Sequence, residues 1–124
     1  MVAGTDKIKE DYMKVFISQP MKDRTDEEIQ KVRNQAIADI KEVYGKDVEI
    51  LDSFISEKPG SETVNEALWS LGKSIQILAQ ADVAYFCEGW DKARGCKIEH
   101  KCALQYGIIA LDNKVDLQEQ RRIK

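Results

Sequence analysis

Short apolar segments alternate along this chain with longer segments in which apolar residues recur at helical spacing. The apolar segments cover residues 14–18, 47–52, 82–87 and 107–111, and we expect each to form a β-strand. Because the connections are too long for hairpins, the strands should run parallel, with helices over both faces of their sheet. The alternation therefore predicts an α/β fold, a three-layer sandwich with a parallel sheet of four or five strands.

Capping signals set the limits of the expected helices. Thr25 and Glu28 form a capping box, and the same pattern recurs at Thr63 and Glu66. Gly45 stands where a helix ends in a residue with positive φ. The expected helices cover residues 25–45, 63–80 and about 93–106.

The right-handed crossover rule arranges the strands in the order 2-1-3-4. In that order the chain moves from the first strand to one side of the sheet and then crosses back to the other side, so the strand order reverses between the first and third strands. Ligands of α/β proteins bind beside such a reversal, outside the carboxyl ends of the strands, which are residues 18–21 and 87–91 here. A small sheet also leaves edges that invite pairing, so we expect a homo-oligomer, either a dimer or a tetramer.

Composition excludes several classes of protein. The 124 residues are the size of one domain, which we place at 14–111, after a flexible lead-in over 1–13 and before a tail or short helix over 112–124. A formal net charge of −3 argues against a nucleic acid polymer as partner. There is no apolar run of transmembrane length and no secretory signal at the N-terminus. Three cysteines suit a reducing compartment, so we expect a cytoplasmic protein without a membrane partner.

The segment after the third strand holds the candidate chemistry. Gly89 and Gly95 frame a loop that we expect to pass close to a ligand, because glycine permits close approach. Glu99 follows about one turn into the next helix. The macrodipole there favours a carboxylate whatever its function, and it also keeps a carboxylate nucleophile ionised. Trp90 either forms a flat wall for a planar ligand or covers a neighbouring subunit.

Cofactors and metals are not indicated. The sequence contains neither a dinucleotide fingerprint nor a Walker phosphate loop, so we expect no cofactor. Cys96 and His100 have i, i+4 spacing, but zinc needs further ligands and no Cys-x-x-Cys occurs, so we expect no metal. We expect His100 on the surface, Cys87 and Cys102 as small core residues, and Ser74 as a solvated hydroxyl.

Several motifs together resemble a known superfamily. They are Phe16-Ile-Ser-Gln-Pro-Met21, Ala81-Asp82-Val83, Gly89-Trp90, Gly95-Cys-Lys-Ile-Glu99 and Ala103-Leu-Gln-Tyr-Gly107. Over residues 14–111 the chain resembles the nucleoside 2-deoxyribosyltransferase-like superfamily, and within it a small branch found in bacteria and their phages. The resemblance implies a flavodoxin-like (Rossmann-like) sheet, a cleft for a nucleoside or nucleotide, and oligomers that complete each other's sites.

The resemblance also implies roles for individual residues. In characterised members, the glutamate of the Gly-x-x-x-Glu motif attacks the anomeric carbon of the sugar and forms an ester, which another base or water resolves. Glu99 matches that glutamate. The transferases carry one aspartate where this chain has Ser74, and another ahead of the motif's glycine, where Asp91 is the nearest candidate for an acid or sugar-hydroxyl partner. The implied substrate-binding positions are Ser18, Gln19, Pro20, Met21, Gly89, Trp90 and Gly95.

Three hypotheses about function follow. The first is an enzyme that cleaves or exchanges the N-glycosidic bond of a nucleoside or nucleotide, with Glu99 as nucleophile. The second is a catalytically inactive nucleotide-binding or sensing module, which the missing aspartates favour. The third is an interaction protein whose Trp90 loop contacts a partner.

Overall fold

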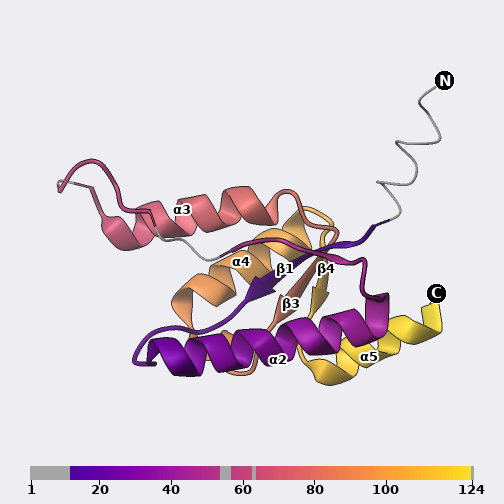
Figure 1. Ribbon diagram of the computed structural model, residues 1–124. Helices are drawn as coiled ribbons and strands as arrows, with labels where there is room; N and C mark the ends of the chain where they lie inside the picture. The colour runs from indigo at the N-terminus through magenta and orange to yellow at the C-terminus, as the bar shows by residue number, and fades with distance from the viewer. Residues whose placement is uncertain (1–11, 54–56, 63, 124) are drawn as a thin grey trace.

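The expected strands and helices form a parallel sheet with helices on both sides (Figure 1). The computed structural model describes residues 12–53, 57–62 and 64–123. In chain order the elements are β1 (Lys14–Ser18), α2 (Asp26–Tyr44), β2 (Glu49–Ile50), α3 (Glu66–Leu78), β3 (Val83–Phe86), the 3-10 helix η1 (Trp90–Lys92), α4 (Arg94–Gln105), β4 (Ile109–Leu111) and α5 (Lys114–Ile123).

The sheet has the strand order β2-β1-β3-β4, and every neighbouring pair is parallel. This confirms the predicted α/β fold and the predicted order. Val15 in β1 pairs with Ile50 on one side and with Val83 on the other. The chain leaves β1 toward β2 and later crosses to β3, so the loops after β1 and β3 part and leave a crevice at the carboxyl ends of the strands.

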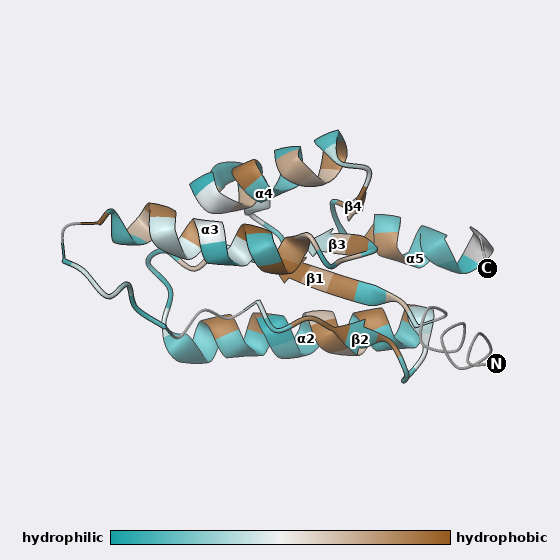
Figure 2. Ribbon diagram, turned by 90° about the horizontal axis from the view of Figure 1, so that it is seen from above, coloured by the Kyte–Doolittle hydropathy of each residue, from teal (hydrophilic) through white to brown (hydrophobic). Residues whose placement is uncertain are grey.

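Alternation along the strands divides the core into two layers, because successive side chains of a strand point to opposite faces. Val15 and Ile17 of β1 pack with α2 and α5, whereas Phe16 packs with α3 and α4. The view from above shows β1 apolar along most of its length between α3 and α2 (Figure 2). Ser18 shares a face with Phe16, so its hydroxyl lies on the α3–α4 side.

The capping signals are confirmed at one helix and corrected at another. Both hydrogen bonds of the capping box at Thr25 are present, and Gly45 ends α2 with a φ of 100°. At α3, however, Asn65 is the N-cap and accepts a hydrogen bond from the backbone of Leu68. A capping box from Thr63 to Glu66 is therefore not what starts α3, because asparagine is the stronger N-cap and lies next to the first helical residue. Thr63 itself lies outside the described residues.

At the ends of the chain, segments outside the predicted domain of 14–111 pack against its core, and of the predicted tail or short helix over 112–124 the structure has the helix. The predicted lead-in over 1–13 falls mostly outside the described residues, but Met13 already packs against the core and its carbonyl accepts from Glu49. Residues 114–123 form a full helix, α5, whose Leu117 is completely buried against the α2 side of the sheet. β2 and β4 are shorter than predicted, since each is an edge strand that pairs on one side only.

Candidate functional site

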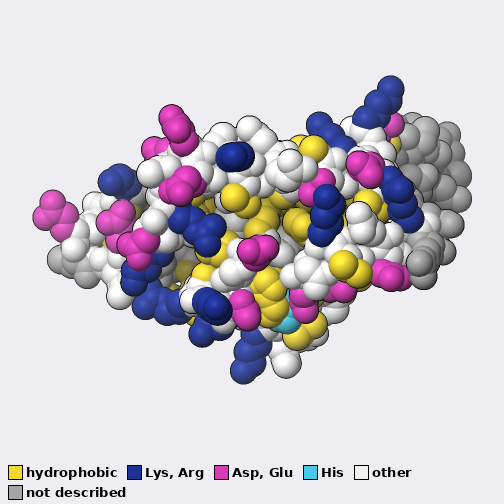
Figure 3. Space-filling view, turned by 90° about the horizontal axis from the view of Figure 1, so that it is seen from below, with side chains coloured by type: hydrophobic (Ala, Val, Ile, Leu, Met, Phe, Trp, Pro, Cys, Tyr) yellow, Lys and Arg dark blue, Asp and Glu magenta, His cyan; other side chains and the backbone are white. Residues whose placement is uncertain are grey.

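A cavity of about 590 Å³ opens at the carboxyl ends of β1 and β3, where the strand order reverses. Its walls come from the loop after β1 and from the segment that leads from β3 into α4. The described residues that line it are Gln19, Pro20, Met21, Lys22, Asp23, Arg24, Gly89, Lys92, Ala93, Arg94, Gly95, Cys96 and Glu99. Figure 3 views this end of the molecule, and Lys and Arg side chains gather beside apolar atoms near the middle of the face.

Glu99 lines this cavity, yet the residue is buried and only 7 % exposed. The Ser18 hydroxyl at the end of β1 donates to its Oε1 over 2.6 Å, and the Ser74 hydroxyl on α3 donates to its Oε2 over 2.5 Å. Three elements, β1, α3 and α4, thus fix one carboxylate. A buried carboxylate with each oxygen held by a separate donor has a defined orientation toward the cavity.

Two opposing effects act on the protonation of Glu99. Burial raises the pKa of its carboxyl because removal from water disfavours the charged form, while the hydrogen bonds from Ser18 and Ser74 lower it. Burial is the larger effect, so the pKa lies above the ordinary value of 4.5. The two serines are therefore the groups that favour the ionised form needed for nucleophilic attack.

Ser74 belongs to the site although it was not among the predicted site residues, even though the resemblance places it where the transferases carry an aspartate. It is buried and bonded to Glu99, so the expectation of a solvated hydroxyl was wrong. A signal was present: Ser74 stands three residues after Leu71 and four before Leu78, on the apolar stripe of its helix. A polar residue on a buried stripe requires a partner, and here the partner is Glu99.

The loop after β1 carries two unusual features. Gln19 is buried, and its Nε2 donates to the carbonyl of Ile29 over 3.1 Å, while its Oε1 has no hydrogen-bond partner among the described residues. Asp23 has a φ of 62°, the left-handed region that few residues other than glycine adopt. Pro20 is buried and Met21 is 42 % exposed at the rim. The predicted positions Ser18–Met21 thus lie at or beside the cavity.

The two glycines have different roles. Gly89 has a φ of 90°, and a β-carbon there would lie 3.4 Å from both Nη2 of Arg24 and Cγ of Pro20. The neighbours of Gly89 are thus side chains of the loop after β1, and the expected close approach to a ligand stays a prediction. Gly95 has ordinary space, with a Leu71 methyl carbon at 3.9 Å, so it lines the cavity without needing to be glycine for steric reasons.

Trp90 does not form the predicted wall of the cavity. Its ring stacks on His100 at 4.0 Å and 18°, and its Nε1 donates to the carbonyl oxygen of Asp112 over 3.2 Å. Gly89 starts a 3-10 turn that directs the indole back toward the α4 side of the sheet, next to Phe86. His100 also departs from expectation: its side chain is 14 % exposed and bonded to Asp112 rather than solvated.

Asp91, the predicted partner of Glu99, is exposed and is not among the residues that line the cavity. The carboxylate that lines it together with Glu99 is that of Asp23. Cys87 and Cys96 are not candidate nucleophiles, because burial raises the pKa of Cys87 to about 12 and also raises that of Cys96.

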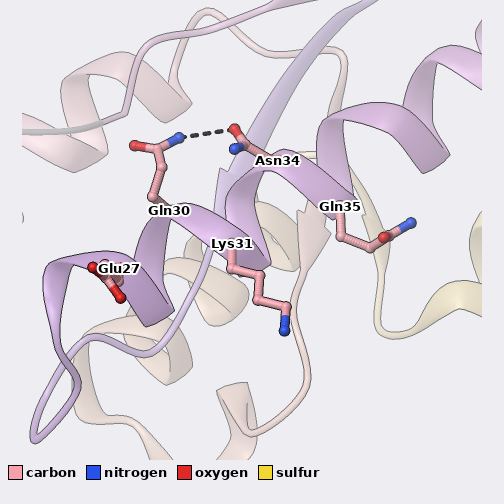
Figure 4. Close-up of a pocket in the computed structure, with 5 residues that line it drawn as sticks. All are labelled: Glu27, Gln30, Lys31, Asn34 and Gln35. Carbon is pink, nitrogen blue, oxygen red and sulfur yellow. Dashed lines mark hydrogen bonds between the residues drawn. The ribbon is translucent and has the colours of Figure 1, made fainter.

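Two other hollows lack comparable chemistry. An apolar groove of about 940 Å³ lies at the opposite ends of the strands, where the carboxylate of Asp82 is already bonded to the backbone of Lys14. A shallow region on α2 is lined by five polar side chains, and Gln30 donates to Asn34 there over 2.8 Å (Figure 4). All five come from one exposed helix, so no second element encloses a ligand. The cavity at Glu99 is therefore the candidate site.

No group of three or more metal-ligating side chains occurs within the described ranges. In the same part of the chain, no helix has both the length and the apolar character needed to span a bilayer. Comparison with protein-family models, with curated proteins and with solved structures gives no significant match for this chain.

Proposed function

We propose that this protein binds a nucleoside or nucleotide in the cavity at the carboxyl ends of β1 and β3, and cleaves or exchanges its N-glycosidic bond through Glu99. One observation carries the proposal: a buried carboxylate contacts a cavity of ligand size and is oriented by two hydroxyl donors. The motifs by which the chain resembles the nucleoside 2-deoxyribosyltransferase-like superfamily support it, since residues 18–21 and 95–99 converge on that cavity.

The reaction proposed has two displacement steps. Ionised Glu99 attacks the anomeric carbon, the carbon–nitrogen bond breaks, and the departing base takes up a proton. Water or a second base then attacks the anomeric carbon and displaces the Glu99 carboxylate. A proton is returned to the acid in the same step. A carboxylate suits both steps because it stabilises an oxocarbenium-like centre and bonds to it reversibly.

Protonation of the leaving base falls to Asp23 in this proposal. Both Asp23 and Asp91 are exposed, but only Asp23 lines the cavity. The left-handed conformation of Asp23 is also typical of functional positions, where local strain is retained. Ser74 occupies the position at which the transferases carry an aspartate, and it supplies a hydrogen bond to Glu99 rather than a proton to the base.

A second candidate function is a binding or sensing module that has kept the cavity without turnover. The observation that favours it is the engagement of both Glu99 oxygens by serines, together with a raised pKa. In such a module Glu99 would accept hydrogen bonds from a ligand without attacking it.

One experiment separates these functions. The protein is incubated with a panel of nucleosides and 5′-monophosphates, and free base is followed by chromatography for wild type, Glu99→Gln and Glu88→Gln. Glu88 is an exposed glutamate outside the cavity lining, so its variant controls for loss of charge. Base release that survives in Glu88→Gln and is lost in Glu99→Gln supports catalysis. Binding without any release by wild type supports the sensing module instead.

The oligomer expected from the sheet edges is also part of the proposal. β4 is an edge strand, and apolar side chains are exposed on it and on α4. They include Ile98 at 39 %, Leu104 at 60 %, Tyr106 at 82 % and Ile109 at 46 % exposure. Two copies could cover these side chains against each other. Light scattering after size-exclusion chromatography tests this, and a monomer at micromolar concentration would contradict it.

A further inference from the structure

The cavity has a charge opposite to that of the chain. The protein carries a net charge of −3, yet the cationic side chains that line the cavity outnumber the carboxylates there. The cations are Lys22, Arg24, Lys92 and Arg94, and the carboxylates are Asp23 and Glu99. None of the four cations forms an ion pair within the part of the chain that the structure describes. Unpaired cations that converge on a cavity favour an anionic ligand.

The start of α4 adds a second source of positive potential. This 12-residue helix begins at the cavity, and its N-cap, Ala93, provides no side-chain hydrogen bond. The first backbone N–H groups of a helix have no partner inside the helix and point out of its end. An anionic group is the usual partner for such an end, because it accepts from those N–H groups and is favoured by the macrodipole.

Gln19 gives an independent indication of a bound molecule. Its side chain is 7 % exposed and lines the cavity, its Nε2 is used by Ile29, and its Oε1 is buried without a partner. A buried acceptor without a donor is unfavourable, because the hydrogen bonds that it made with water are not replaced. A doubly ionised phosphate, the main form at pH 7, cannot satisfy it, since it has no proton to donate. The ligand that completes this site therefore carries both an anion and a separate hydrogen-bond donor.

We propose that the ligand is a nucleoside 5′-monophosphate rather than a free nucleoside. Its phosphate binds at the start of α4 between Arg24 and Arg94, and a hydroxyl or amino group of its nucleoside part donates to Oε1 of Gln19. Glu99 lies about one and a half turns along α4 from Arg94, roughly 7.5 Å at 1.5 Å per residue. This spacing leaves room for a pentose between the phosphate and the carboxylate. The inference rests on the proposed function, because it assigns the substrate class of the same cavity.

The test uses Glu99→Gln, which binds without turnover, and isothermal calorimetry with a 5′-monophosphate, the matching nucleoside and inorganic phosphate. We expect the monophosphate to bind at least about tenfold more tightly than the nucleoside, since charge-assisted hydrogen bonds are the strong ones. Inorganic phosphate should compete with it. In the Glu99→Gln background, a second substitution, Arg24→Gln or Arg94→Gln, should remove most of the difference in affinity between monophosphate and nucleoside. The affinity for the nucleoside should stay unchanged. Lys97→Gln, on the same helix but outside the cavity lining, should have no effect.

Gln19→Met tests the second contact. It should weaken the nucleoside and the monophosphate by the same factor, because the donor belongs to the part that they share. Circular dichroism establishes that each variant is folded before its binding is compared.

The outcomes separate this inference from the proposed function. Equal binding of nucleoside and monophosphate, or equal weakening of both by the arginine variants, overturns the phosphate site. Base release by wild type would then still uphold the proposed function. Absence of base release from every compound, with tight monophosphate binding, overturns catalysis and leaves the phosphate site standing. If no compound binds, both fail.

Discussion

The hydroxyl of Ser74 on α3 donates a 2.5 Å hydrogen bond to Oε2 of Glu99 on α4, across a sequence separation of 25 residues. The bond connects the two helices that cover one face of the sheet, and it occupies one of the two oxygens of the candidate nucleophile. The hydrogen bonds from Ser74 and Ser18 lower the pKa of Glu99, whereas burial of the carboxyl raises it by more.

Ser74→Ala removes a donor that favours the ionised carboxylate, so the pKa of Glu99 should rise further. A reaction that needs ionised Glu99 should then lose activity at mildly acidic pH, by about tenfold for loss of a hydrogen bond to a charged group. The acidic limb of the kcat/KM profile should move to higher pH. Ser70→Ala on the same helix controls for the substitution, and an identical limb in Ser74→Ala would contradict the role of the hydroxyl.

Glu99 should make the stability of the protein depend on pH. Because its pKa is raised in the folded state, the folded protein keeps a proton that the unfolded chain releases near the ordinary value of 4.5. The stabilisation is complete below that value and is lost as pH rises through the folded-state pKa. Glutamine does not titrate, so the free energy of unfolding of Glu99→Gln should not fall in this way. Relative to wild type, the variant should become more stable as pH rises above about 4.5. Urea unfolding between pH 4 and 8 measures the difference, with Glu88→Gln expected to parallel wild type.

Trp90 should matter for stability rather than for substrate. Its indole stacks on His100 and bonds to the carbonyl of Asp112. Trp90→Phe loses that hydrogen bond and part of the stacking surface, and we expect a loss of about 1–2 kcal/mol. KM should stay within about twofold of wild type. A large rise in KM with unchanged stability would contradict this and show that Trp90 contacts the substrate.

Gly89→Ala should damage the cavity rim. The substitution puts a β-carbon on a residue at φ 90°, which costs about 1–2 kcal/mol in backbone strain. The β-carbon would meet Arg24 and Pro20 at 3.4 Å, which is ordinary contact, so the backbone strain is what should shift the rim and weaken ligand binding. Gly72→Ala is the matched control, since Gly72 lies inside α3 with open space around it and should gain about 0.5–1 kcal/mol. Thermal unfolding and ligand titration test both variants.

The proposed acid can be tested by two matched variants. Asp23→Asn keeps a residue that tolerates positive φ and removes the proton donor, so we expect kcat to fall about 100-fold. Asp91→Asn, beyond the cavity, should change kcat less than about twofold. The reverse result would reassign the acid to Asp91. Loss of activity with a leaving group that needs no protonation would show instead that Asp23 positions the loop.

Local patterns in the sequence were sufficient to predict the fold and the strand order of this protein. The alternation of apolar and amphipathic segments predicted the α/β fold, and the crossover rule predicted the order β2-β1-β3-β4. Thr25 with Glu28 predicted where α2 begins. These inferences succeed because each depends on residues within a few positions of one another, or on a handedness that holds for parallel strands in general. They also placed Glu99 beside the reversal of the sheet.

The composition of the site depended on tertiary structure. The bonds from Ser18 and Ser74 to Glu99 span 81 and 25 residues. The apolar stripe of α3 indicates that Ser74 faces inward, but no local pattern indicates that its partner is Glu99 on α4. The φ of 90° at Gly89 turned Trp90 toward His100, and the φ of 62° at Asp23 accompanies a loop that brings Arg24 next to Gly89. Local patterns in the sequence are enough to predict the sheet, its strand order and the position of the glutamate. The packing of α3 on α4 and the conformations of two loops set which side chains share its cavity, because contacts between distant segments depend on packing in three dimensions.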